Sequence, residues 1–230
     1  MKKINYVIIA FILISCSQQS TEPKAQTVKP TVKCQSEVNY GDIILCNPEI
    51  VGMQECLTNE KIRLRQDNLS MKGSKTLGYY ISSEKYKNLE ILEKLKVSDI
   101  IKIYALEAYS KTFIGIKELN STFAILKNNY IIAEWDSLKL VLENKNLDFE
   151  ISQPILIDSY SLNDNAKSAT LLMRASKETD ERITVMTMNL LICKNRLIFL
   201  SYYLEYTGIE SVTKAKAKND YIALRFLEAN

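Results

Sequence analysis

One stretch of this chain contains several carboxylates, which are side chains that could take part in catalysis or in cation binding. Glu178, Asp180 and Glu181 form an acidic cluster, and Asp158 and Asp164 lie nearby in the sequence. Paired carboxylates can act as a general acid and base, or they can bind a cation. The segment 176–182, however, has the polarity of a hairpin loop and contains basic residues that neutralise the cluster locally. A solvated loop is the favoured interpretation, and a carboxylate-dependent hydrolase is the least favoured functional hypothesis.

The chain contains no histidine. This excludes Ser-His-Asp and Cys-His catalysis, histidine metal sites and an imidazole pH switch. No pair of cysteines has the CxxC spacing of a four-thiolate zinc site, and there is neither an EF-hand spacing nor a glycine-rich phosphate loop. The sequence therefore predicts a non-enzymatic protein with no metal and no cofactor.

Near the start of the chain, two lysines precede an apolar run over residues 6–14, which ends in Leu13-Ile14-Ser15-Cys16. A membrane-spanning helix needs about 20 apolar residues, so this short run favours a signal peptide. The last four residues resemble the lipobox of bacterial lipoproteins. This resemblance implies that residues 1–15 are removed and that the Cys16 thiol receives a diacylglycerol. Together with palmitate, these acyl chains would anchor the mature protein to a membrane.

Four further cysteines are Cys34, Cys46, Cys56 and Cys193. An even number in an exported chain suggests two disulfides, for which three connectivities exist. The segment between Cys46 and Cys56 contains a proline and a glycine, which favours a local loop closed by that pair. Cys34 would then reach Cys193 and tie the N-terminal part to the C-terminal sheet. A single reactive thiol is the alternative, but nothing near any cysteine argues for a lowered pKa.

The charge balance argues against a nucleic-acid partner. Removal of residues 1–15 takes away two of the 30 basic residues, against 27 acidic ones, so the mature chain is close to neutral. Residues 16–33 are mostly Ser, Gln, Thr, Lys and Pro, which predicts a lipidated cysteine followed by a disordered tether. Residues 34–230 then form a single domain. Lys214, Lys216 and Lys218 fan around a helix and predict a solvated face rather than a phosphate site.

Helical spacing dominates the centre of the domain. Ser98 can cap a helix that buries Ile101, Tyr104, Ala105 and Ala108. Two further stripes have the same period, namely Ile116, Leu119, Phe123 and Leu126, and Ile132, Trp135, Leu138 and Leu142.

Strand patterns dominate the rest. They cover residues 76–81, 155–160, 169–174, 183–192 and 197–206, with turn-like residues at 163–166 and 193–196. After Gly208 the period becomes helical, with Ile209, Val212, Asn219, Ile222 and Phe226 on one face, and Thr207 and Glu210 fit a capping box. Strands joined by hairpins are antiparallel. The predicted fold class is α+β, an antiparallel β-sheet covered by helices.

The strand Leu197-Ile198-Phe199-Leu200-Ser201-Tyr202-Tyr203, a short loop and a closing helix up to Asn230 look like the C-terminal half of PsbP-like α/β/α proteins. The similarity covers the order of elements over the last third of the chain. It implies an α/β/α sandwich and a protein that acts by binding other proteins. It carries over no functional residue.

Aromatic residues are the candidate binding residues. Trp135 is the only tryptophan, and Tyr202, Tyr203 and Tyr206 occupy the last predicted strand. Alternation places Tyr202 and Tyr206 on one face of the sheet and Tyr203 on the other. Aromatic side chains are enriched at binding surfaces, but packing alone favours tyrosines in strands equally. For Trp135, its place in a helical apolar stripe favours core packing over a ligand-stacking role.

Two functional hypotheses remain. The first is a membrane-anchored interaction or structural lipoprotein with a protein partner in the cell envelope. It predicts an exposed apolar patch and no deep pocket. The alternative is a small-ligand- or lipid-binding periplasmic lipoprotein, which predicts a pocket of about 300–1,000 Å³ with a few convergent polar groups. Residue 17 is a serine and not the aspartate that retains lipoproteins at the inner membrane. We therefore expect the protein to be anchored in the outer membrane, facing the periplasm.

Overall fold

The computed structural model describes residues 32–87, 98–127, 150–177 and 180–230 of the chain. Val32–Asn230 form one compact unit. The predicted lipobox, Cys16 and Trp135 lie outside the described residues. Among the described residues, no helix has both the length and the apolar character needed to cross a membrane.

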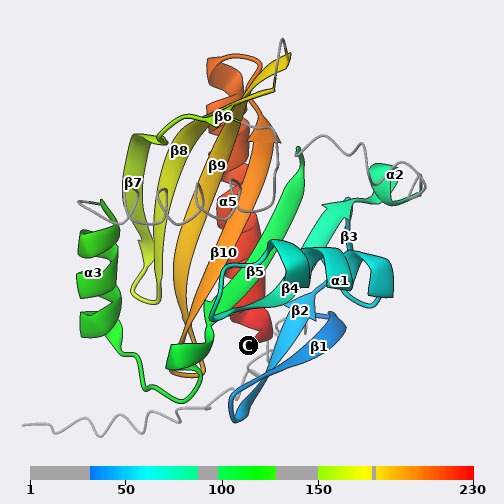
Figure 1. Ribbon diagram of the computed structural model, residues 1–230. Helices are drawn as coiled ribbons and strands as arrows, with labels where there is room; N and C mark the ends of the chain where they lie inside the picture. The colour runs from blue at the N-terminus through cyan, green and yellow to red at the C-terminus, as the bar shows by residue number, and fades with distance from the viewer. Residues whose placement is uncertain (1–31, 88–97, 128–149, 178–179) are drawn as a thin grey trace, which may run out of the picture. The chain divides into compact units, whose positions relative to one another are not determined.

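The described strands form an eight-stranded sheet and a separate two-stranded hairpin (Figure 1). The order in the large sheet is β3-β4-β5-β10-β9-β8-β6, and β7 also pairs with β8. The strands of this sheet are β3 (Met53–Glu55), β4 (Ser74–Ser82), β5 (Ile100–Leu106), β6 (Glu150–Ile151), β7 (Ile155–Asn163), β8 (Ala166–Lys177), β9 (Asp180–Cys193) and β10 (Arg196–Glu205). The hairpin consists of β1 (Cys34–Tyr40) and β2 (Ile43–Pro48). Every one of these pairings is antiparallel.

Helices accompany the sheet on both faces. They are α1 (Glu60–Leu69), α2 (Ser83–Tyr86), α3 (Ile116–Ile125) and α5 (Ile209–Ala229), with a 3₁₀ turn at Glu107–Tyr109. The long helix α5 lies behind the sheet in the view of Figure 1, and α3 lies at its front left. The predicted α+β class with an antiparallel sheet is therefore confirmed.

The hairpin of β9 and β10 forms the centre of the sheet. Its register runs from the Arg196–Cys193 pair to the Glu205–Thr184 pair without interruption. The connecting residues Lys194 and Asn195 have φ of 48° and 61°. Two consecutive positive φ values give a tight turn whose twist matches that of the strands. The strands and turns predicted for the last third of the chain are confirmed, because both patterns are local.

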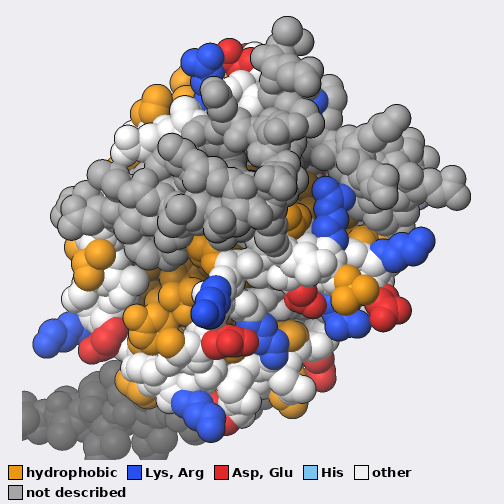
Figure 2. Space-filling view, viewed as in Figure 1, with side chains coloured by type: hydrophobic (Ala, Val, Ile, Leu, Met, Phe, Trp, Pro, Cys, Tyr) orange, Lys and Arg blue, Asp and Glu red, His pale blue; other side chains and the backbone are white. Residues whose placement is uncertain are grey.

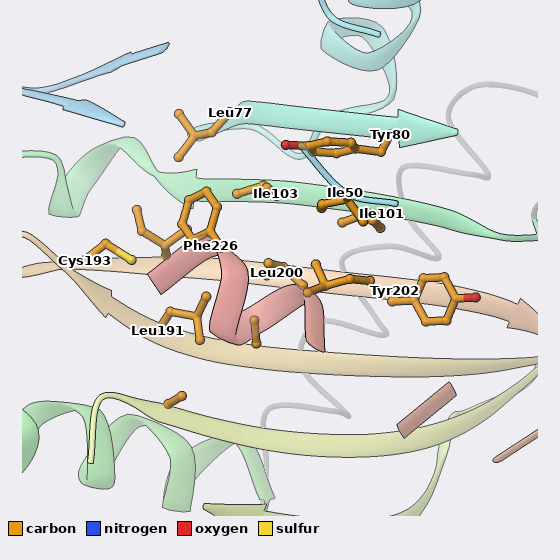
Figure 3. Close-up of a cluster of buried hydrophobic side chains, with 14 of the residues drawn as sticks. Ile50, Leu77, Tyr80, Ile101, Ile103, Leu191, Cys193, Leu200, Tyr202 and Phe226 are labelled. Carbon is orange, nitrogen blue, oxygen red and sulfur yellow. The ribbon is translucent and has the colours of Figure 1, made fainter. Parts of the chain in front are cut away.

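Side chains of β9 and β10 alternate between two cores. On one face, Leu191, Cys193 and Leu200 pack with Phe226 of α5, as Figure 3 shows for this cluster. On the other face, Leu190 packs with residues of α3. Because both faces are buried, these strands are almost continuously apolar, as expected for strands covered on both sides.

The predicted helix from Ser98 is wrong. Residues Ile100–Leu106 form β5, which pairs with β4 on one side and β10 on the other. Ile101, Ile103 and Ala105 face the α5 core. β-Branched isoleucines favour an extended backbone. Tyr104 and Leu106, on the other face, are partly buried against the core beside α3. Because apolar residues occupy both faces, the sequence also matched a helical stripe.

Two details of the predicted helices are also wrong. Ile116 and Ile209 belong to the predicted apolar stripes, but both are exposed. The predicted capping box of α5 does not form: the N-cap is Gly208, and the Thr207 hydroxyl contacts Ser211 instead of a helix amide. Gly208 has a φ of 141°, which a residue with a side chain rarely adopts. The glycine lets the chain reverse direction there, and this leaves Ile209 on the outer side.

The β1–β2 hairpin is fastened to the sheet at several points. Asp42 in its turn forms an ion pair of 2.7 Å with Arg196 of β10. The Asn230 side chain accepts a hydrogen bond from the Cys46 amide (2.8 Å) and donates one to the Cys46 carbonyl (3.0 Å). Gly41 has a φ of 60°, and a Cβ there would lie 2.1 Å from the Ser110 carbonyl oxygen. The hairpin turn therefore requires glycine on both conformational and steric grounds.

A disulfide joins Cys34 and Cys46, whose Cα atoms are 5.5 Å apart. The predicted pairs, Cys46 with Cys56 and Cys34 with Cys193, are wrong. Antiparallel pairing of β1 with β2 brings Cys34 and Cys46 together, whereas Cys56 and Cys193 are buried as free thiols in two different cores.

The arrangement predicts a clear pattern of thiol reactivity. Burial raises the pKa of Cys56 to about 12 and that of Cys193 to about 12. A thiol reacts as its thiolate. At pH 8, we expect iodoacetamide to leave both thiols unmodified in the folded protein and to alkylate both in denaturant. Cys34 and Cys46 should react only after reduction.

Peptide mass spectrometry measures all four sites, and a reduced, denatured sample is the positive control. A peptide that cross-links Cys56 to Cys46, or Cys193 to Cys34, would contradict the assignment.

Candidate functional site

The clearest recess formed by described residues is a groove of about 480 Å³ between α3 and the sheet, which we call the α3 groove. Leu106 of β5 and Leu197 and Phe199 of β10 line its sheet side. The rest of its wall comes from the segment before α3 and from α3 itself, namely Tyr109, Thr112, Phe113, Ile114, Lys117, Glu118, Ser121, Thr122, Ile125 and Leu126. Figure 2 shows hydrophobic side chains gathered on this face, beside α3.

Two buried leucines hold α3 against the sheet. Leu119 and Leu126 are almost fully buried and belong to the same core cluster as Phe199. At the start of the helix, the Glu118 carboxylate accepts a hydrogen bond of 3.0 Å from the Gly115 amide. This bond satisfies a backbone donor just before the first turn and fixes the entry of the chain into the helix.

The segment before α3 is positioned by Arg196. Its Nε donates to the Ser110 carbonyl at 2.9 Å, while its other guanidinium nitrogens contact Asp42 and the Asn195 carbonyl. The Ile114 amide also donates to the Asn195 carbonyl at 3.0 Å. The β9–β10 turn therefore fixes two parts of the structure, namely one end of the groove wall and the β1–β2 hairpin.

The rim of the groove exposes large apolar side chains. Phe113 is 67% exposed and Ile125 58%. When an apolar ligand covers side chains of this kind, their apolar surface is removed from water, which favours binding. The groove combines an apolar sheet side with a mixed wall, in which polar residues of α3 stand beside Ile125 and Leu126.

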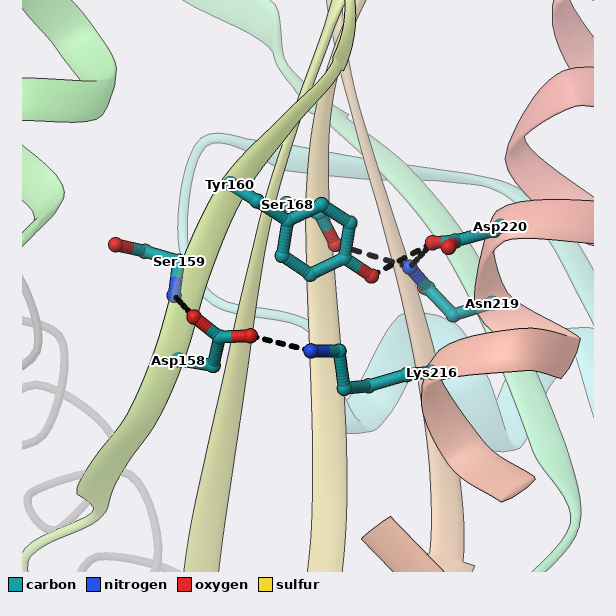
Figure 4. A network of polar contacts seen from close by, with 7 residues as sticks. All are labelled: Asp158, Ser159, Tyr160, Ser168, Lys216, Asn219 and Asp220. Carbon is teal, nitrogen blue, oxygen red and sulfur yellow. Dashed lines mark hydrogen bonds and ion pairs between the residues drawn. The ribbon is translucent and has the colours of Figure 1, made fainter. Parts of the chain in front are cut away.

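A second group of residues consists of buried polar side chains between α5 and the sheet (Figure 4). Asn219 of α5 donates to Ser168 of β8 and to Asn189 of β9, both at 3.0 Å. It also accepts a hydrogen bond of 2.7 Å from Thr187. All four residues are fully buried. Because each Asn219 atom is bonded within the protein, this network fixes the helix on the sheet and offers no vacant group to a ligand.

A hydrogen bond and an ion pair between β7 and α5 lie beside this network. Asp220 accepts a hydrogen bond of 2.6 Å from the Tyr160 hydroxyl. Lys216 contacts Asp158 of β7. Burial and the hydrogen bond to Asp220 raise the pKa of Tyr160 to about 12. These contacts tie the edge strand β7 to α5.

The predicted aromatic site residues do not form one surface. Tyr202 is buried and donates a hydrogen bond of 2.9 Å to Asp99, and Tyr206 packs against the same core. Tyr203 packs on the opposite face, as the predicted alternation requires. The prediction for Trp135 concerns a residue outside the described part of the chain.

The acidic residues predicted as a cluster form separate ion pairs with basic residues. Glu181 pairs with Arg174 at 2.7 Å, and Asp158 is engaged by Lys216. Glu178 lies outside the described residues. No group of three or more acidic residues or cysteines in the described ranges could hold a metal ion. Of the three lysines predicted to form a solvated face, Lys216 and Lys218 are in ion pairs.

The sequence reasoning missed the groove residues. Leu126 was assigned to a helical stripe, but the contribution of Phe113 and Ile114 was not recognised. The available signal was an apolar pair directly before a helix start at Gly115, because apolar residues there pack against the neighbouring structure.

The buried network supports a stability prediction. We expect Asn219→Ala to lower the free energy of unfolding by about 3 kcal/mol, because Ser168, Thr187 and Asn189 lose a buried partner. Lys214→Ala, at an exposed position of the same helix, should change it by less than about 0.5 kcal/mol. Urea denaturation followed by circular dichroism measures both. Equal losses would show that Asn219 does not fix the helix.

Comparisons with known proteins give a remote structural likeness and no match of sequence. No family model matches the chain, and no curated protein matches it. Among solved structures, the Saccharomyces cerevisiae Ran-binding protein Mog1p is similar, with 12% sequence identity and a TM-score of 0.37. The match covers 86% of this chain and 92% of that chain.

Proposed function

We propose that this protein is a non-enzymatic lipoprotein of the bacterial cell envelope that binds an apolar ligand in the α3 groove. The observation that carries the proposal is the groove itself. Its volume of about 480 Å³ lies within the range of ligand pockets, about 300–1,000 Å³. Its sheet side is apolar, and its polar groups lie on α3 and at Thr112.

The groove favours the second of the two hypotheses drawn from the sequence. A pure interaction protein was expected to show an exposed apolar patch without a pocket, whereas a ligand-binding protein was expected to have a pocket. The exposed rim residues Phe113 and Ile125 keep a protein partner in the envelope as a second candidate. Such a partner would cover the rim with its own apolar side chains.

Two observations support the other parts of the proposal. Asp158 and Glu181 are engaged in ion pairs, which supports a binding role over carboxylate catalysis. The Cys34–Cys46 disulfide supports an oxidising compartment such as the periplasm. The order β7 to β10 followed by α5 agrees with the proposed PsbP-like arrangement, which an experimental structure superposed on that family would test.

Blocking the groove tests the binding function. Ser121 is an exposed residue that lines the groove, so Ser121→Trp should fill it. Asn120 is the adjacent exposed residue of α3 and does not line the groove, so Asn120→Trp is the matched control. Native mass spectrometry of full-length protein extracted in mild detergent should detect a small molecule on the wild type and on Asn120→Trp, but not on Ser121→Trp.

Equal retention by all three proteins would place the ligand elsewhere and contradict the proposal. A stoichiometric protein partner that is lost only in Ser121→Trp would instead support the second candidate.

The anchor has a separate test. We expect the wild type to sediment with the outer membrane and to carry a mass increase of two or three acyl chains. Cys16→Ala should lack this mass and should leave the membrane after processing or remain as an unprocessed precursor. Membrane fractionation and intact-mass measurement check both. An unmodified Cys16 in the native protein would contradict the lipoprotein assignment.

A further inference from the structure

From the distribution of charge along the α3 groove, we infer that its ligand is a single long acyl chain that ends in a carboxylate, with the carboxylate placed at Lys117. This inference rests on the proposed ligand-binding function and specifies its ligand class. It depends on the length of α3 that lines the groove, on the apolar floor and on Lys117, which forms no ion pair with any described residue.

The groove follows one side of α3. Its helix residues are adjacent pairs that repeat every four residues, from Lys117 and Glu118 to Ile125 and Leu126, and so lie on one side of the helix. Eight residue steps correspond to about 12 Å of helix. Across from them, Leu106, Leu197 and Phe199 provide a floor with no charged group. The apolar floor suits a hydrocarbon chain, whereas the α3 wall carries polar residues near its start and Ile125 and Leu126 near its end.

The charged groups of the groove lie toward one end. Lys117 and Glu118 belong to the first turn of α3, whereas Ile125 and Leu126 lie at its other end. The Glu118 carboxylate is engaged by the Gly115 amide. Lys117 forms no ion pair with any described residue. Its charge has the same sign as the partial charge of the helix N-terminus, so an anion is favoured there.

One chain fits the groove better than two. The volume of about 480 Å³ is in the lower half of the range of ligand pockets, about 300–1,000 Å³. We therefore assign the groove to a free fatty acid rather than to a two-chain phospholipid. The exposed side chains at the rim, Phe113 and Ile125, would contact parts of the chain that are not enclosed.

Photo-cross-linking on the full-length protein in phosphatidylcholine nanodiscs tests this assignment. Hexadecanoate and hexadecan-1-ol, each with a diazirine at the same chain carbon, are the two probes, and mass spectrometry maps the adducts. We expect both probes to label peptides that contain Ile114 or Leu126, with hexadecanoate about two- to fivefold more efficient, as expected for one partly exposed ion pair. Lys117→Gln should remove this difference. Lys127→Gln, which changes an exposed lysine of the same segment outside the groove, should leave it unchanged.

The outcomes separate the two proposals. Equal labelling of the groove by acid and alcohol in the wild type would overturn the carboxylate assignment and leave the groove as an apolar site. Labelling that persists in Ser121→Trp, or that maps outside the groove, would overturn the binding function as well. Displacement of the probe by two-chain phosphatidic acid but not by unlabelled hexadecanoate would overturn the assignment to a single chain.

Discussion

The pairing of β9 with β10 is the constraint on which the rest of the structure depends. These two strands contribute side chains to both cores, because alternate residues face α5 and α3. Their turn places Arg196 where it holds the β1–β2 hairpin and the segment before α3 at the same time. A change in the register of this pair by one residue would exchange the two faces and remove the support of the α3 groove.

The polar network around Asn219 specifies how α5 lies on the sheet. Apolar packing alone allows a helix to slide along a sheet by small steps at little cost, because hydrophobic burial is not directional. Hydrogen bonds from Asn219 to β8 and β9 define one position. The same helix contacts β7 through Asp158 and Tyr160, so the edge of the sheet is fixed together with its centre.

The sequence predicted the last third of the fold well and the first part poorly. The hairpins from β7 to β10 depend on local turn residues and on strand patterns that are complete within a short segment. β5 was mistaken for a helix because apolar residues occupy both of its faces, so its sequence alternates less clearly than its burial does. The disulfide was misassigned because the choice among four cysteines depends on the pairing of β1 with β2, which spacing along the chain does not determine. The groove was missed because its walls come from β5, β10 and α3, whose contacts are visible only in three dimensions.

The fastening of the β1–β2 hairpin has a consequence for the time course of folding. Its partners Lys194, Arg196 and Asn230 lie 150 to 184 residues further along the chain. Contacts over such separations are slow to form, because the intervening chain must first be closed into a loop. The hairpin therefore cannot reach its final position before Lys194, Arg196 and Asn230 have been synthesised and are free to contact it. Although it comes first along the described chain, its position is set by the segments that come last.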